Sequence, residues 1–149
     1  MNSVQEYLAG VNERRRGCIS DGVSNCIGTA FYLVGVQPTD NYVAANAWEG
    51  AVNLGNHNDV LRSFDELPDP VLGCLVGWEL RNVFFHAGVI VGKSPAKIAQ
   101  RVRANGFFHK SGSLEFVDRM RGGSEDRVKR YLLPPKLKDA IEKDMGVAA

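Results

Sequence analysis

Apolar side chains recur at helical spacing close to the N-terminus. They predict a short amphipathic helix over residues 3–15 that ends before Gly17. The apolar residues of this segment are Val4, Tyr7, Leu8 and Val11.

A second apolar segment follows a run of turn-forming and helix-capping residues. Residues 26–34 have the length of a short helix, and Gly35 stops it. The side chains of Ser24 and Asn25 can both accept a hydrogen bond from the free N–H groups at a helix start, so either can be the N-cap. This places Cys26 in the first helical turn.

The middle of the chain gives mixed signals. Pro38-Thr39-Asp40 predicts the start of a helix that continues through Val52, and Gly55-Asn56-His57-Asn58 predicts a loop. Residues 65–70, rich in Asp and Pro, predict a turn.

From residue 71 onward the pattern is mostly that of strands. Short segments rich in β-branched or aromatic residues alternate with Gly, Pro, Asn or Ser, and a polar helix over residues 136–145 closes the chain. Helices followed by several strands predict an α+β fold with an antiparallel sheet. The predicted strands are residues 71–78, 83–91, 98–102, 107–109 and 128–133.

The composition is that of a folded domain with almost no net charge. The 149 residues are 44% hydrophobic and 23% charged, so we expect one domain, residues 1–149, with its own core. The 18 Lys and Arg against 17 Asp and Glu create no overall field for nucleic acid. Arg14-Arg15-Arg16 is too small a cluster to change that expectation. We therefore expect no nucleic-acid partner, and the oligomeric state stays open.

No segment has the character of a membrane span or of a secretory signal. The longest apolar stretch, residues 83–92, is interrupted by His86 and is far shorter than the roughly 20 residues that cross a bilayer. The N-terminal residues lack the apolar core of a signal peptide. We expect no membrane insertion and a cytoplasmic location as encoded, with export by a signal-independent route as the alternative.

The cysteines form no obvious pairs. Cys18, Cys26 and Cys74 are odd in number and include no Cys-x-x-Cys motif, which argues against a disulfide framework and against a zinc ribbon. We expect at least one free thiol and no metal or other cofactor.

Cys26 is the strongest candidate for a nucleophile. A thiol reacts as the thiolate, and the free N–H groups at a helix N-terminus favour that anion. The required base is expected to be His86, a polar residue in an apolar strand, where strict alternation puts it on the face of Phe84 and Gly88. His109, on the next predicted strand, is the candidate to orient the imidazole.

Each of these residues also has a simpler interpretation. A free cysteine is most often a small core residue, and a lone histidine in a strand is most often structural. With Cys74 or His57, the three could instead bind zinc, although none of them has the short spacing of structural zinc sites. Their order along the chain, Cys, His and His, favours a cysteine hydrolase.

The same residues resemble the motifs of the NlpC-type papain-like cysteine peptidases and amidases, which are related to the CHAP-type amidases. Asn25-Cys26-Ile27-Gly28 lies where that family has Asp-Cys-Ser-Gly, and residues 66–73 resemble its Leu-x-Pro-Gly-Asp turn. His86-Ala87-Gly88-Val89-Ile90-Val91-Gly92 is similar to its His-Val-Gly-Ile-Tyr-x-Gly strand, and Phe107-Phe108-His109 to its Phe-Ile-His. The resemblance covers roughly residues 24–117.

The resemblance implies a papain-like core, in which the Cys26 helix packs on an antiparallel sheet of five to six strands and His109 holds the imidazole of His86. It implies a thiol protease or amidase, a hydrolase that acts on a peptide or on a peptidoglycan stem peptide. Family members use an acidic residue and a tyrosine to bind the amino end of a peptide, where this chain has Asn25 and Arg14. An intracellular acyltransferase or deamidase, or a catalytically silent binding module, are therefore the alternatives on the same scaffold.

The chemistry expected of this site is acyl transfer. Cys26 attacks a carbonyl, His86 takes the thiol proton and returns it to the leaving amine, and water releases the acyl-enzyme. The backbone N–H of Cys26 is the first candidate donor to the oxyanion. The side chains of Asn25, Ser24 and Ser20 are the further candidates for oxyanion or substrate binding.

Overall fold

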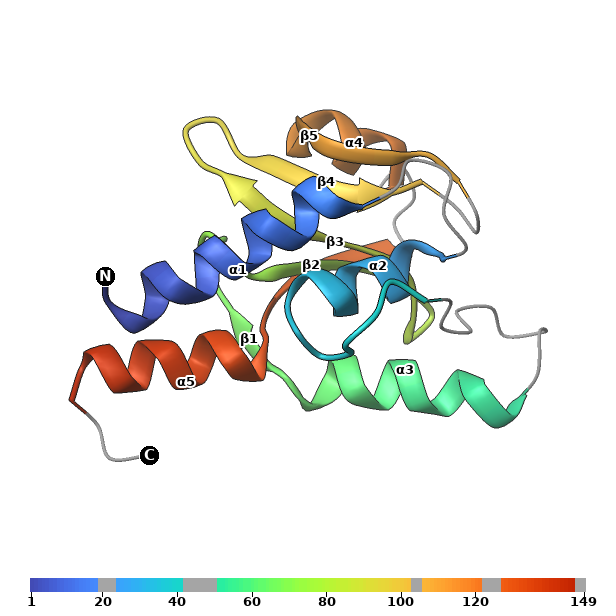
Figure 1. Cartoon of the computed structure of the whole chain (residues 1–149). Helices are drawn as coiled ribbons and strands as arrows, with labels where there is room; N and C mark the ends of the chain where they lie inside the picture. Colours follow the sequence, from blue (N-terminus) through green and yellow to red (C-terminus); the bar gives the residue numbers. More distant parts are fainter. Residues whose placement is uncertain (19–23, 42–50, 103–105, 122–126, 147–149) are drawn as a thin grey trace.

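The computed structural model describes residues 1–18, 24–41, 51–102, 106–121 and 127–146. Within these ranges five helices surround a six-stranded antiparallel sheet of order β1-β6-β2-β3-β4-β5 (Figure 1). Strands β2 and β3 therefore lie at its centre, and β1 and β5 form its edges. This arrangement confirms the α+β class with an antiparallel sheet.

After the first three helices, five strands follow in succession, and then α4, β6 and α5 complete the order along the chain. The helices are α1 (Ser3–Gly17), α2 (Cys26–Leu33), α3 (Ala51–Ser63), α4 (Leu114–Arg121) and α5 (Pro135–Asp144). The strands are β1 (Asp65–Leu67), β2 (Leu75–Leu80), β3 (Val83–Gly92), β4 (Lys97–Arg101), β5 (Phe108–Ser113) and β6 (Arg127–Leu133).

Different helices cover the two faces of the sheet. Trp78 of β2 is paired with His86 of β3, and its indole N–H donates to Asp118 of α4 at 2.9 Å. Because paired side chains share a face, α4 lies on the face that carries His86. On the opposite face, Arg101 of β4 donates to Thr29 of α2 at 2.8 Å.

Helix α3 lies on the same face as α2. Arg62 of α3 pairs with Glu79 of β2 at 2.8 Å, and its guanidinium lies 5.4 Å from the ring centroid of Phe84. Helix α1 packs against α2 and α5 and is joined to the sheet layer by the Tyr7 hydroxyl, which donates to the Gly73 carbonyl at 2.7 Å. The Cys helix is therefore held between the sheet and other helices.

The predicted helices at residues 3–15 and 26–34 are confirmed, and each predicted strand overlaps an observed one. Helix α4 was not predicted, although Leu114 and Val117 are buried at helical spacing. Strand β1 lies in the predicted turn at residues 65–70, where it pairs with β6 as a short edge strand.

The prediction for the middle of the chain is wrong in two places. Residues 38–41, where a helix was predicted to start, are not helical. Gly55 to Asn58, which were predicted to form a loop, lie inside α3. Residues 42–50 of the predicted helix lie outside the described residues. Packing explains why a polar segment is helical here. His57 is 1% exposed, with Nε2 3.3 Å from the Phe84 carbonyl, and Leu61 is fully buried. Contacts with the sheet override the weak local preference.

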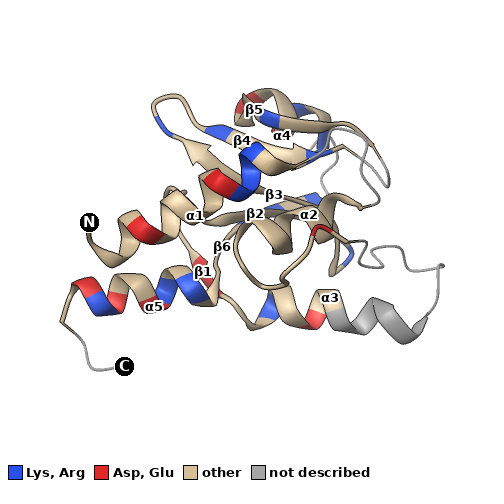
Figure 2. Cartoon of the chain, in the orientation of Figure 1, with Lys and Arg blue, Asp and Glu red and all other residues tan. Residues whose placement is uncertain are grey.

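Charges of both signs are distributed over the described residues of the helices other than α2, which has no charged residue. Figure 2 shows acidic and basic residues mixed along α5 and basic residues at the end of α1. None of the described helices is long and apolar enough to cross a membrane.

Candidate active site

The start of α2 is capped as the sequence predicts. Asn25 is the N-cap, with extended backbone at φ −133°, and its side-chain oxygen accepts a hydrogen bond from the Gly28 N–H at 2.8 Å. A side chain at Gly28 would collide with the carbonyl of Asn41, so glycine lets the following loop approach the helix. Cys26 is therefore the first helical residue, and it is 7% exposed.

The thiol of Cys26 lies against the backbone on either side of His86. Its Sγ donates to the Phe85 carbonyl at 3.7 Å, and the N–H of Ala87 also points to the sulfur. Around His86, the backbone edge of β3 that faces β4 does not pair with that strand, because the pairing of β3 with β4 covers only Val89 to Gly92. Helix α2 packs on the sheet face opposite to His86, but its N-terminus lies at the backbone of β3 next to this candidate base.

Two opposing influences act on the Cys26 thiol. Burial raises its pKa above the usual value, whereas the N–H groups of Ala87 and Ile27 and the positive charge of Arg121 lower it. Burial is the largest of these effects, so the resting thiol is protonated at neutral pH.

His86 is buried in the centre of the sheet, where its ring packs against Trp78. The ring centroids are 5.3 Å apart, and the imidazole is 1% exposed. A bulge pairs Trp78 with His86 but Glu79 with Phe84. Because of this bulge, Phe84 lies on the face opposite to His86, and the prediction from strict alternation that they share a face is wrong.

Gln100 of β4 holds the imidazole of His86. Nε2 of His86 lies 2.5 Å from the side-chain oxygen of Gln100, which is itself 7% exposed. A carbonyl oxygen only accepts, so Nε2 carries the proton and Nδ1 keeps the free lone pair. Burial, aided by the charge of Arg121, lowers the pKa of His86 to about 3, so the ring is neutral.

His109 lies one strand farther from His86 than Gln100 does. It is paired with Gln100 in the β4–β5 ladder, is exposed, and packs edge-on against Phe107 with ring centroids 4.9 Å apart. The hydrogen bond that the resemblance assigns to His109 is thus made by Gln100. A catalytic role for His109 stays a prediction.

The structure brings the start of α2 to the strand of His86 but shows no direct thiol–imidazole contact. Within the described parts of the chain, no hydrogen bond joins Cys26 to His86 or to His109. Nor does any group of three His, Cys, Asp or Glu there lie close enough to hold a metal ion. The zinc ligands considered from the sequence, Cys26, His86 and His109 with Cys74 or His57, are not gathered into one site.

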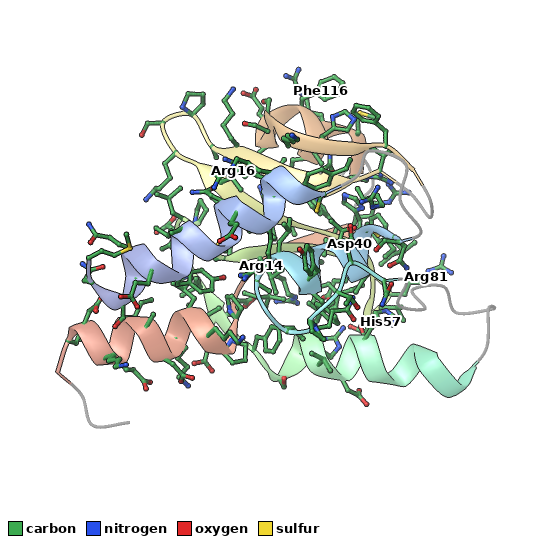
Figure 3. The ribbon with its side chains drawn as sticks, in the orientation of Figure 1. Arg14, Arg16, Asp40, His57, Arg81 and Phe116 are labelled. Carbon is green, nitrogen blue, oxygen red and sulfur yellow. The ribbon has the colours of Figure 1, made fainter. Side chains whose placement is uncertain are left out.

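A network around the buried Arg101 of β4 joins this strand to α2 and to Asp40, which follows α2 in the chain. Arg101 is fully buried and bonds Asp40 at 2.9 Å and Thr29 at 2.8 Å, while the Thr29 hydroxyl donates to Asp40 at 2.7 Å. Figure 3 shows Asp40 beside α2. Ser24 is fully buried in the same network, with its hydroxyl 3.2 Å from that of Thr29. This network fixes the Cys helix relative to the strand that carries Gln100.

The remaining predicted substrate contacts have other roles or lie outside the described residues. Asn25 caps α2, and Arg14 donates to the carbonyl of Leu33 at the other end of that helix, at 3.1 and 2.8 Å. A guanidinium at a helix C-terminus satisfies free carbonyls. Ser20 is not among the described residues.

A groove of about 270 Å³ opens beside Gln100, between β4, β5 and α4. Its lining is mostly apolar and also includes His109 and Arg121. Figure 3 shows Phe116 projecting from α4 at the top of the molecule, at the rim of this groove. Because Gln100 lines it, the groove gives access to the residue that holds the candidate base His86.

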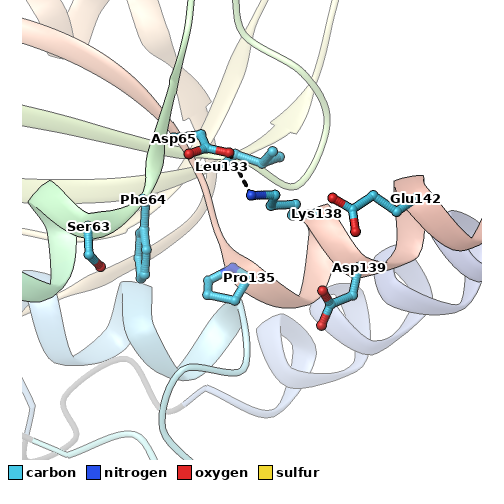
Figure 4. Close-up of a pocket in the computed structure, with 8 residues that line it drawn as sticks. All are labelled: Ser63, Phe64, Asp65, Leu133, Pro135, Lys138, Asp139 and Glu142. Carbon is cyan, nitrogen blue, oxygen red and sulfur yellow. Dashed lines mark ion pairs between the residues drawn. The ribbon is translucent and has the colours of Figure 1, made fainter. Parts of the chain in front are cut away.

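Another pocket, of about 360 Å³, lies between the end of α3, β1, β6 and the start of α5 (Figure 4). Lys138 and Asp65 in its wall pair with each other at 3.0 Å. Asp139 and Glu142 leave an acidic rim. None of the residues considered catalytic lines it.

Gln100 is the functional candidate that sequence reasoning missed. It is a polar residue between Ala99 and Arg101 in a buried strand, and a polar side chain in such a strand needs a partner. The same signal that singled out His86 could have found it.

Comparisons of the chain with protein-family models, with curated proteins and with solved structures found no match. Function must therefore be inferred from the site itself.

Proposed function

We propose that this protein is a cysteine hydrolase with a papain-like site, in which Cys26 attacks an amide carbonyl and His86 is the general base. The observation that carries the proposal is the seating of the Cys26 thiol against Phe85 and Ala87, the two neighbours of His86. The Gln100 bond supports it, because it fixes the tautomer that a base needs.

Before the first step, the Cys26 thiol and the His86 imidazole are both neutral. Nδ1 of His86 takes the thiol proton as Sγ bonds to the carbonyl carbon, whose oxygen becomes the oxyanion. The N–H of Cys26 is the proposed donor to that oxyanion. The amine leaves with the proton from Nδ1, and the resulting thioester is cleaved by water, which returns the proton to sulfur.

The low pKa of His86 shapes this mechanism. A ring with a pKa of about 3 does not hold a proton in the resting state, so proton transfer accompanies attack on the carbonyl. Nearby N–H groups and Arg121 favour the negative charge that develops on sulfur as the proton leaves.

The test is turnover of amide substrates by wild type and Cys26→Ala, with products identified by mass spectrometry. Peptidoglycan stem peptides and a mixture of short peptides serve as substrates. We expect cleavage to disappear in Cys26→Ala and to persist in Cys74→Ala, which removes a buried thiol elsewhere in the core. Undiminished cleavage by Cys26→Ala would refute the proposal. Release of ammonia without chain cleavage, or transfer of the acyl group to an added amine, would identify a deamidase or an acyltransferase.

A catalytically silent binding module is the second candidate. It is favoured by one observation: the thiol bonds the Phe85 carbonyl instead of His86, while burial raises its pKa. A silent module would cleave none of these substrates, and its Cys26→Ala variant would bind them as tightly as the wild type does.

A further inference from the structure

The groove between β5 and α4 combines apolar walls with a position next to the candidate site. Gln100, the hydrogen-bond partner of His86, lines it, and so does Val117 of α4, which is buried. At its rim Phe116 and Met120 are 58% and 61% exposed. Large apolar side chains that remain this exposed mark a surface suited to an apolar ligand.

The size of the groove limits what it can hold. Its volume of about 270 Å³ is below the roughly 300–1,000 Å³ of sites that enclose a whole small molecule. It can accommodate one large side chain of a substrate whose remainder lies outside the groove.

A cation is among the residues that line this groove. Arg121 is the last residue of α4, lines the groove and donates to the Val102 carbonyl at 3.0 Å. No carboxylate in the described part of the chain forms an ion pair with it. Arg121 lines the same groove as Gln100, the hydrogen-bond partner of His86, and its positive charge lowers the pKa of both Cys26 and His86. A half-buried guanidinium that pairs with no carboxylate among the described residues is well suited to a carboxylate of a ligand.

We propose that this groove is a substrate subsite that takes an apolar side chain, and that Arg121 binds a carboxylate beside it. The substrate class is then a short peptide with a large apolar side chain and a carboxylate next to the scissile amide. This inference rests on the proposed function, because it assumes that the reacting carbonyl lies at Cys26.

The charge can be tested without knowing the substrate. The alkylation rates of Cys26 by iodoacetate and by iodoacetamide are measured by peptide mass spectrometry, and their ratio reports attraction of a small anion. We expect Arg121→Gln to lower this ratio about five-fold and Arg121→Lys to retain most of it. Arg119→Gln is the matched control, because Arg119 is on the same helix but is 74% exposed and paired with Glu115. It should leave the ratio unchanged.

The apolar wall is tested by protection of Cys26. We expect 3-phenylpropionate to slow alkylation of Cys26 by iodoacetamide more than either 3-phenylpropanamide, which lacks the charge, or propionate, which lacks the ring. Phe116 is exposed at the rim and is not part of the core. In Phe116→Ser, 3-phenylpropionate should therefore protect Cys26 no better than propionate does. Equal protection by all three compounds would overturn the subsite.

The outcomes separate this inference from the proposed function. If Cys26 reacts with iodoacetamide but Arg121→Gln does not change the ratio, the subsite assignment is wrong, while the proposed function of Cys26 still stands on the turnover test of Cys26→Ala. If Cys26 is no more reactive than the buried Cys74 toward both reagents, the proposed function is wrong and the subsite assignment falls with it.

Discussion

Nε2 of His86 lies 2.5 Å from the side-chain oxygen of Gln100, across from the point where the Cys26 helix meets β3. This bond joins two neighbouring strands beyond the end of their backbone ladder. It determines which nitrogen of the ring carries the proton, and it leaves Nδ1 as the acceptor. The candidate base is thus oriented by a side chain that is buried and uncharged.

Removing the Gln100 amide should release the His86 ring. We expect Gln100→Ala to lower Cys26-dependent turnover at least ten-fold, because an unoriented base loses much of the 10²–10⁴-fold that general-base catalysis contributes. Gln100→Glu should raise the pKa of His86, because a nearby carboxylate stabilises the imidazolium. An NMR titration of His86 checks the second effect. An unchanged pKa in Gln100→Glu would show that the two side chains do not interact.

The buried imidazole should make stability depend on pH. Its pKa is about 3 in the folded state and ordinarily 6.5, so the unfolded state binds the extra proton. The contribution is present above pH 6.5 and is lost as pH falls toward 3. We expect the free energy of unfolding to drop by about 2 kcal/mol from this group between pH 7 and pH 5.

Urea unfolding at the two pH values measures this drop. In His86→Gln the drop should be smaller by that amount, whereas His109→Gln, which replaces an exposed histidine, should behave as wild type. The same slope in wild type and His86→Gln would contradict the prediction.

The protonated resting thiol predicts a particular reactivity profile. Burial raises the pKa of Cys26, so its alkylation by iodoacetamide should keep rising about ten-fold per pH unit from pH 6 to 9. A preformed thiolate–imidazolium pair would instead give a plateau near neutral pH. Cys74, whose pKa burial raises to about 11, is the internal reference in the same mass-spectrometric measurement.

The buried Arg101–Asp40 pair should contribute much more to stability than an exposed pair. We expect Asp40→Asn to lower the free energy of unfolding by about 3 kcal/mol, because it removes the carboxylate that pairs with the buried guanidinium of Arg101. Glu115→Gln, which breaks the exposed pair with Arg119, is the matched control and should cost less than about 0.5 kcal/mol. Denaturant unfolding compares the two. A loss in Asp40→Asn as small as in Glu115→Gln would show that the network does not hold α2.

The cap of the Cys helix can be changed in two ways. Asn25→Ala should cost about 1 kcal/mol, because the Gly28 N–H loses its acceptor. Asn25→Asp keeps an acceptor and should retain stability, but its negative charge should raise the pKa of the Cys26 thiol further. Unfolding and alkylation rates measured on both variants check these expectations. Equal stability of Asn25→Ala and wild type would contradict the assignment of the cap.

Local features of this chain could be predicted because their causes are local. A cap at Ser24 or Asn25, the helix start at Cys26 and the strand around His86 follow from neighbours within a few positions, and the structure selects Asn25 as the cap. The helix through Gly55 to Asn58 could not be predicted, because burial of His57 and Leu61 against the sheet decides it.

The amino-acid sequence by itself determined the α+β class and the seating of a cysteine at a helix start, since hydrophobic period and capping chemistry act over short distances. Tertiary structure alone decided which groups meet. A bulge at Trp78 separates Phe84 from His86, and the register of β4 brings Gln100 to the imidazole while His109 lies one strand farther out. Register is a property of paired strands, so no single segment encodes it.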